Sequence, residues 1–452
     1  MAASTWNFWV TLDVRRNIKN LGKNYCGMNS VSMRGGSQVN EKVSRYRWVM
    51  AAVTWLMLFS LGASWFCFTP MIVTMMGDLG ITFEQVGFLV ALIPLALVIL
   101  CIPGGMFADR FGVRPTVVIG GLIMGVFGLL RGFATSFPTL AITMFLCGVG
   151  YSIAYPNLPK VTGLWFPFKE YALASGVMFT GMEVGIASSF VLTPAVLLPL
   201  TKSWQGVFIA VGILALAMTL VWILLAKERP VNLTTDQSKG LPSSEREGVP
   251  FRKSISAVLK NRYMWIVMLT CLFLLAPQIG LLGFLSTMLT LRGTDPTTAG
   301  LITSMISWFM IPGSFITPII SDRIGVRKPF IWATSIVAAV ALYFTGTVTG
   351  FPLWASVIAY GFLIGSMAPI ILAMPVELMG ASYSATAGGF TLVGGYIGAM
   401  IAPWLAGYLS TATGSFLPAV MMCTAFTGVE VVCGLMLKET GSKRQSITSL
   451  SS

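Results

Sequence analysis

Hydrophobic and polar positions follow one another in long blocks along this chain. Twelve apolar stretches are separated by short polar turns, and each is long enough to cross a bilayer, which takes about 20 mostly apolar residues. The first six span 48–74, 84–107, 115–134, 138–163, 171–198 and 205–226, and the second six span 263–290, 297–320, 329–348, 353–377, 385–409 and 416–437. The pattern predicts an all-α membrane protein with twelve transmembrane helices.

The remaining polar segments divide the predicted protein into regions. Residues 1–46 lack the compact apolar core of a cleavable signal peptide, and we expect a flexible cytoplasmic tail there. Two six-helix bundles are expected over 47–226 and 263–437. The polar segment 227–262 between them predicts a cytoplasmic linker, and 438–452 predicts a second cytoplasmic tail.

Charge is scarce and one-sided in this sequence. Only 10% of the residues are charged, against about 25% in a typical soluble domain, so lipid must be the solvent for much of the surface. Of the 29 lysines and arginines, 25 fall in segments on one side of the predicted membrane, while Lys202 and Arg292 fall on the other. Positive residues favour the cytoplasmic side, so we expect a multi-pass cytoplasmic-membrane protein with both termini inside. This bias explains the net charge of +13 without a nucleic-acid partner.

Residues for catalysis or metal binding are sparse. The chain has no histidine, and six of its seven cysteines lie in apolar stretches without the spacing of a metal site. It also lacks the glycine-rich phosphate-binding loop that ATP-driven pumps use. We therefore predict neither an enzyme nor a cofactor or metal protein. The expected partners are membrane lipid, a small-molecule substrate and protons, and we expect a monomer.

An internal repeat links the two halves. Residues 105–115 read GMFADRFGVRP and residues 321–329 read SDRIGVRKP, with Asp109 and Asp322 separated by 213 residues. The same offset links Arg110 to Arg323, Gly112 to Gly325, Arg114 to Arg327, Gly176 to Gly389, Gly181 to Gly394 and Gly185 to Gly398. A constant offset over this length indicates an internal duplication, so the two six-helix bundles are predicted to be pseudo-symmetric.

The two repeated loops resemble the conserved loop motif of the major facilitator superfamily. The resemblance covers residues 47–440 and implies two halves around a central cavity that opens alternately to each side. Glycine permits the tight turn, and aspartate can pair with arginine, so we expect a charge lock that breaks and reforms as the halves move. The lock would comprise Asp109, Arg110, Gly112, Arg114, Asp322, Arg323, Gly325 and Arg327.

Within the superfamily, the third and fourth stretches resemble the cyanate and nitroimidazole porter family. The resemblance rests on Arg131-Gly132, Gly148-Val149-Gly150 and the run from Pro156 to Lys160. The chain departs from nitrate and nitrite porters, which carry an arginine in the second helix, because no basic residue occurs between Glu84 and Arg110. Nitrate is therefore a weak candidate substrate.

Charged residues inside the apolar stretches are the first candidates for transport, because burying them in a membrane is costly. Glu183 lies near the middle of the fifth stretch, and we expect it to couple proton movement to substrate; the alternative is a structural glutamate between helices. Arg131 and Lys160 favour an anionic substrate, unless each side chain only extends to the membrane surface. Glu430 is expected to be structural. Other candidate substrate contacts are Tyr151, Tyr155, Asn157, Gln278 and Tyr360.

Together these features predict a secondary active transporter. We expect it to move a small organic or inorganic anion across the cytoplasmic membrane by alternating access, coupled to protons. Two alternatives stay open: a transporter of a neutral or cationic solute or drug, and a non-transporting sensor or assembly factor with the same fold.

Overall fold

The computed structural model describes residues 45–228 and 251–441. Within these ranges twelve helices are long and apolar enough to cross a membrane, and no strand occurs. The predicted fold class is therefore confirmed. Most of the two expected tails and of the expected linker lies outside the described residues.

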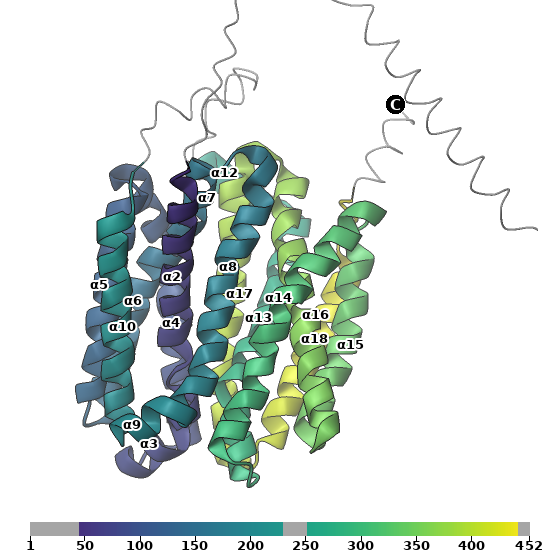
Figure 1. Cartoon of the computed structure of the whole chain (residues 1–452). Helices are drawn as coiled ribbons and strands as arrows, with labels where there is room; N and C mark the ends of the chain where they lie inside the picture. The colour runs from purple at the N-terminus through teal and green to yellow at the C-terminus, as the bar shows by residue number, and fades with distance from the viewer. Residues whose placement is uncertain (1–44, 229–250, 442–452) are drawn as a thin grey trace, which may run out of the picture. The chain divides into compact units, whose positions relative to one another are not determined.

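The N-terminal half holds the first six spans (Figure 1). Three of these spans change helix type at a proline: short 3-10 segments contain Pro70 in the first span and Pro156 in the fourth, and a π-helical segment contains Pro194 in the fifth. Proline removes a backbone donor and so breaks the helix locally. The helices are α2 (Arg47–Phe66) with α3 (Ile72–Leu79), α4 (Phe83–Phe111), α5 (Val113–Leu130), α6 (Phe137–Ala154) with α7 (Leu158–Trp165), α8 (Phe168–Leu192) with α9 (Leu198–Thr201), and α10 (Trp204–Leu225).

The C-terminal half holds the other six spans. They are α13 (Arg262–Leu291), α14 (Pro296–Ile324), α15 (Lys328–Thr347), α16 (Phe351–Met379), α17 (Ser384–Thr413) and α18 (Leu417–Met436). A short helix outside the membrane spans, α12 (Phe251–Lys260), precedes α13 and packs against α13 and α17. Its position falls within the segment that the sequence predicted to be a linker.

The 213-residue offset also relates close helix–helix contacts at glycine in the two halves. A Cβ on Gly185 would overlap the Phe59 carbonyl oxygen, and a Cβ on Gly398 would overlap that of Leu272. Each of these residues is 213 positions from its counterpart. The same offset relates the contact of Gly181 with Trp55 to that of Gly394 with Met268. The two bundles therefore pack their first and fifth helices in the same way, which the repeat predicted.

Two seams join the halves. Helix α4 packs against α17, and α8 packs against α14 (Figure 1). A Cβ on Gly87 would overlap the Pro403 carbonyl oxygen, and one on Gly300 would overlap that of Phe190. These two contacts are again related by the 213-residue offset. Only glycine allows two helix backbones to approach this closely.

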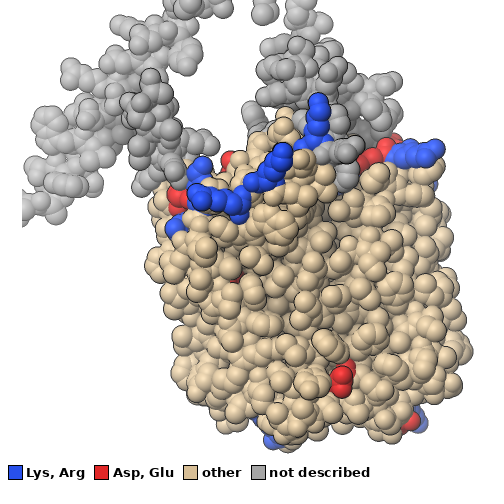
Figure 2. All heavy atoms as spheres, turned by 180° about the vertical axis from the view of Figure 1, so that it is seen from behind, with Lys and Arg blue, Asp and Glu red and all other residues tan. Residues whose placement is uncertain are grey.

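The described lysines and arginines gather at one end of the bundle, as Figure 2 shows. This basic end carries the α4–α5 turn (109–114) and the α14–α15 turn (322–328), whereas Lys202 and Arg292 lie at the opposite end. Between the ends, the face seen in Figure 2 shows few charged residues. The Gly87 and Gly300 contacts lie in the parts of α4 and α14 nearer the opposite end, so the halves are closely packed there.

Candidate functional site

Glu183 lies on the α8–α14 seam between the two halves. Gly176, Glu183 and Phe190 are seven residues apart, so they share one face of α8. Gly176 faces the Phe315 ring of α14, and Phe190 faces Gly300. Glu183 lies between these two contacts, and its counterpart on α14 is Ser307.

The Glu183 carboxyl lacks a cationic partner among the described residues. Its side chain is half-buried, and its Oε2 atom is buried without a hydrogen bond. The Ser307 hydroxyl lies beside the carboxyl, yet neither Ser307 Oγ nor Glu183 Oε2 meets hydrogen-bond geometry. A charged carboxylate in this environment would be costly, so the site favours binding a proton or a ligand.

Aromatic side chains of the N-terminal half lie near this carboxyl. Tyr151 and Tyr155, at the α6–α7 junction, stack with ring centroids 5.3 Å apart, and both lie within electrostatic range of Glu183. Trp65 meets Tyr151 edge-on at 5.2 Å, and its Nε1 is buried without a partner. We call Trp65, Tyr151, Tyr155, Glu183, Ser307 and Tyr396 the central cluster.

Tyr396 brings the second seam helix, α17, into the central cluster. Its side chain lies close to that of Tyr155 of the N-terminal half. Tyr396 is also the residue 213 positions after Glu183. The repeat thus places a carboxyl and a phenol at equivalent positions, one on each seam. The central cluster therefore holds residues from both halves, which is where a moving solute would have to pass.

Arg131 lies elsewhere, inside the N-terminal half. Its side chain is fully buried, and its hydrogen bonds and ring contact are all with residues of that half. Nη1 donates to the Ser64 carbonyl at 3.0 Å, Nη2 donates to Ser64 Oγ at 2.9 Å, and Nε donates to the Gly128 carbonyl at 3.2 Å. The guanidinium also lies 4.7 Å from the Phe208 ring centroid. These contacts fix the C-terminal end of α2, next to Trp65.

Replacing Arg131 separates a structural role from a substrate contact. We expect Arg131→Met to lower the stability by about 2–5 kcal/mol, because it leaves buried Ser64 and Gly128 acceptors without donors. We expect Arg131→Lys to recover only part of this loss, since lysine cannot reach both Ser64 atoms in the planar geometry of a guanidinium. Thermal unfolding of purified protein measures both. An unchanged melting temperature in Arg131→Met, with a raised KM for uptake, would instead make Arg131 a substrate contact.

Lys160 and Asn157 connect α7 to α4 near the basic end. Lys160 Nζ donates to Asp109 Oδ1 at 2.5 Å and to the Gly105 carbonyl at 3.0 Å. Asn157 is buried, and its Nδ2 donates to the Gly104 carbonyl at 3.0 Å. Lys160 thus belongs to the same charge network as the α4–α5 turn rather than to the central cluster.

The turns between α4 and α5 and between α14 and α15 are capped in matching ways. Glu228, just after α10, accepts from the Val113 and Arg114 amides at 3.0 Å each. Glu439, just after α18, accepts from the Arg327 and Lys328 amides at 2.7 and 3.2 Å. Each carboxylate satisfies free N–H groups at a helix N-terminus, where negative charge is favourable. In each half the sixth helix is thereby tied to the start of the third.

The glycines of these turns allow a backbone conformation with positive φ, whereas the arginines differ in the groups they contact. Gly112 and Gly325 have φ values of 94° and 74°, which favour glycine. Arg114 Nη2 donates to the Ile223 carbonyl at 2.8 Å. Arg110 is exposed and lies 5.3 Å from the Phe111 ring, and Arg323 is exposed as well.

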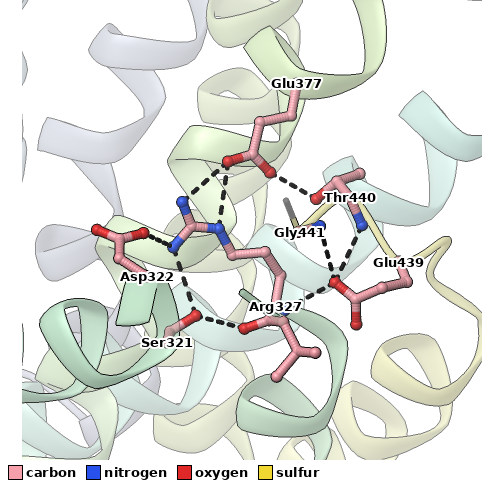
Figure 3. A network of polar contacts seen from close by, with 8 residues as sticks. Ser321, Asp322, Arg327, Glu377, Glu439, Thr440 and Gly441 are labelled. Carbon is pink, nitrogen blue, oxygen red and sulfur yellow. Dashed lines mark hydrogen bonds and ion pairs between the residues drawn. The ribbon is translucent and has the colours of Figure 1, made fainter. Parts of the chain in front are cut away.

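Arg327 forms the centre of the network at the basic end of the C-terminal half (Figure 3). It pairs with Asp322 at 2.6 Å and with Glu377 at 2.9 Å. Burial alone would lower the pKa of Arg327, but its hydrogen bond to Glu377 and the charges of Glu377 and Asp322 raise the pKa above its ordinary value. Thr440 donates to Glu377 Oε2 at 2.5 Å, and these groups line a polar cavity of about 310 Å³. Arg327 therefore stays charged at any physiological pH.

The remaining two candidates lie in the C-terminal half. Gln278 of α13 is half-buried, with Nε2 3.5 Å from Met310 Sδ of α14. Tyr360 of α16 is fully buried, its hydroxyl has no partner, and it lies within electrostatic range of Glu430 of α18. Tyr360 therefore points into the C-terminal bundle.

Sequence reasoning did not select several residues of these sites. Tyr396 and Ser307 were missed, although the 213-residue offset leads directly from Glu183 to Tyr396. Glu228 and Glu439 were also missed as caps. Both directly follow a lysine at the end of the sixth helix of a half, so Lys227-Glu228 and Lys438-Glu439 were available signals.

Comparison with known proteins identifies the family. The family model described as Major Facilitator Superfamily matches residues 54–293 and 278–450. The chain belongs to the Major Facilitator Superfamily. This membership confirms the predicted superfamily and identifies the chain as a transport protein rather than an enzyme.

The individual members of the superfamily that match this chain share low sequence identity with it. The probable sulfoacetate transporter of Cupriavidus necator is 25% identical over 383 residues, covering 80% of this chain and 86% of the relative. Monocarboxylate transporter 13 of Bos taurus is 27% identical over 334 residues, covering 72% of this chain and 73% of the relative. Among solved structures, a bacterial homologue of the human lysosomal transporter Spinster matches with a TM-score of 0.69 at 16% identity. That match covers 87% of this chain and 97% of the other, and it shows the shared fold.

Proposed function

We propose that this protein is a secondary transporter that moves a small organic anion, a carboxylate or a sulfonate, together with a proton bound at Glu183. The observation that carries the proposal is the Glu183 carboxyl on the seam between the halves. It has a buried, unpaired oxygen and no cationic partner among the described residues.

The coupling follows from electrostatics. An anion entering the central cluster would meet the Glu183 carboxylate at close range, in surroundings of low dielectric constant where like charges repel strongly. Protonating Glu183 removes this repulsion, so anion and proton would bind together. The unpaired Trp65 Nε1 and Ser307 Oγ then offer neutral donors to the anion.

The choice of an anion rests on the substrates for which the relatives are named. The relatives reported above are named for transport of sulfoacetate and of monocarboxylates, which are anions at neutral pH. The resemblance of the third and fourth helices to cyanate and nitroimidazole porters stays a prediction. We place the basic end in the cytoplasm, because positive residues favour that side, and we expect the monomer to be the transporting unit.

One observation favours a second candidate function. Neither Arg131 nor Lys160 contacts the central cluster, and the other described lysines and arginines lie near the two ends of the bundle. A cluster with a carboxyl and no cation also suits a cationic or neutral solute, with Glu183 as its direct partner.

A binding screen followed by a transport assay distinguishes the anion transporter from the second candidate function. A ligand that binds the folded protein raises its melting temperature, so purified protein is heated with small carboxylates, sulfonates, cyanate, nitroimidazoles and organic cations. Hits are then tested in proteoliposomes with the interior alkaline. We expect a carboxylate or sulfonate to bind and to accumulate under the pH gradient. Stabilisation by cations alone would establish the second candidate instead.

A further inference from the structure

Glu430 is a second carboxyl inside the membrane-spanning part of the protein, and the proposed function does not use it. It lies on α18, its side chain is fully buried, and both its oxygens lack a hydrogen bond. No lysine or arginine among the described residues forms an ion pair with it. A bare carboxylate here would be very costly, so something must neutralise it.

The packing of α15 against α18 shows what faces Glu430. The two helices run in opposite directions, with Gly434 against Ile331 near one end and Val420 against Gly346 near the other. This register places residue 430 opposite Ser335, and the Ser335 hydroxyl does lie beside the Glu430 carboxyl. Position 335 is fully buried as well.

The hydrogen of Ser335 is already used. Its hydroxyl donates to the Ile331 carbonyl at 2.8 Å, within its own helix. The same Oγ also lies 3.1 Å from Met367 Sδ, a second acceptor. A serine hydroxyl has one hydrogen and two lone pairs, so while that hydrogen points to Ile331 or Met367, Ser335 offers only lone pairs to Glu430. The carboxylate of Glu430 also only accepts. Two acceptors that face each other in a dry interior repel unless a positive charge lies between them.

We propose that Glu430 and Ser335 hold a small monovalent cation, a proton or a sodium ion, inside the C-terminal half. This site is separate from Glu183, which lies on the seam between the halves. Other groups near it can complete the coordination or titrate: the unpaired Tyr360 hydroxyl of α16 and the Cys271 thiol of α13 lie within electrostatic range of Glu430. On α18 itself, Cys433 lies within the same range. From α17, Tyr396 lies within electrostatic range of Cys271.

Thermal unfolding of the detergent-purified full chain tests the site without a known substrate. Sodium chloride is compared with choline chloride at equal ionic strength, and the pH is varied separately from 5.5 to 8.5. If the ion is sodium, we expect sodium to raise the melting temperature of the unmodified protein by at least about 2 °C. If it is a proton, we expect the melting temperature to fall as the pH rises while sodium has no effect.

Variants assign the response to this site. Glu430→Gln carries its own hydrogens and no charge, so we expect it to lose the sodium shift or the pH shift. Glu84→Gln is the matched control, and we expect it to keep the shift, because Glu84 lies in the first turn of α4, away from Glu430. Glu183→Gln should keep a sodium shift, which separates this proposal from the coupling role of Glu183, but it is left out of the pH comparison because it removes the proton proposed at Glu183. An equal shift in Glu430→Gln and the unmodified protein would overturn the proposal. If Glu430→Gln does not fold, Ser335→Ala decides: a reduced shift supports the site, and an unchanged one overturns it.

Discussion

Replacing Glu183 by glutamine is expected to abolish uphill uptake while sparing exchange. A pH difference of one unit is worth about 1.4 kcal/mol per proton, which can drive about tenfold accumulation of a cotransported monoanion. Glutamine resembles the protonated acid in shape but cannot release a proton, so a gradient can no longer do work through this position. Exchange of labelled for unlabelled substrate needs no proton release, and we expect it to continue. Both rates are measured in proteoliposomes.

The control for this experiment is Glu84→Gln. Glu84 lies in the first turn of α4 at the opposite end, away from the central cluster. We expect this variant to keep the full gradient response. If Glu183→Gln still accumulates substrate tenfold under a one-unit gradient, Glu183 does not carry the coupled proton. Loss of both accumulation and exchange would instead indicate that the carboxyl binds the solute directly, as the second candidate function requires.

The fold could be predicted from the sequence because each of its determinants is local or periodic. Twelve apolar stretches set the spans, and the observed spans fall on the same twelve segments. The repeat was also visible as an offset, and the paired glycine contacts of α8 and α17 follow it. The break after Phe66 occurs at a proline, but proline alone does not predict such breaks, because α4 and α14 continue through theirs.

The candidate sites could be predicted only in part, because partners depend on how helices are oriented. The sequence places Lys160 at a helix end but cannot show that its ammonium reaches Asp109, 51 positions away. Likewise, a buried arginine looks the same in sequence whether it faces solute or backbone carbonyls. Arg131 faces the Ser64 carbonyl and Lys160 faces Asp109, so the anion prediction loses both of its supports from the sequence. Tyr360 was a candidate because of its helix, and only the structure shows that its hydroxyl points into the C-terminal bundle.

Adding a side chain at Gly300 is expected to force the halves apart at the end opposite the basic one. A Cβ there would overlap the Phe190 carbonyl oxygen, which is backbone and cannot rotate away. Overpacking of this kind costs about 1–3 kcal/mol. Since about 1.4 kcal/mol changes an equilibrium constant tenfold, Gly300→Val should shift the population toward the state open at this end by about fivefold to a hundredfold. By the repeat, Gly87→Val should act in the same way at the other seam.

The readout is chemical access to the central cluster. A cysteine at position 307, in a variant whose native cysteines are replaced, would be labelled slowly by a membrane-impermeant maleimide added from the opposite end, because Ser307 is fully buried. We expect Gly300→Val to speed this labelling at least about fivefold and to slow net transport, because the closed state is now disfavoured. Gly428→Val is the control: a Cβ there meets nothing within 4 Å, so labelling should not change. Equal labelling rates in Gly300→Val and its parent would mean that this contact does not hold the halves together, and the closure would then have to depend on the aromatic contacts of Phe416 with Phe83 and Phe284.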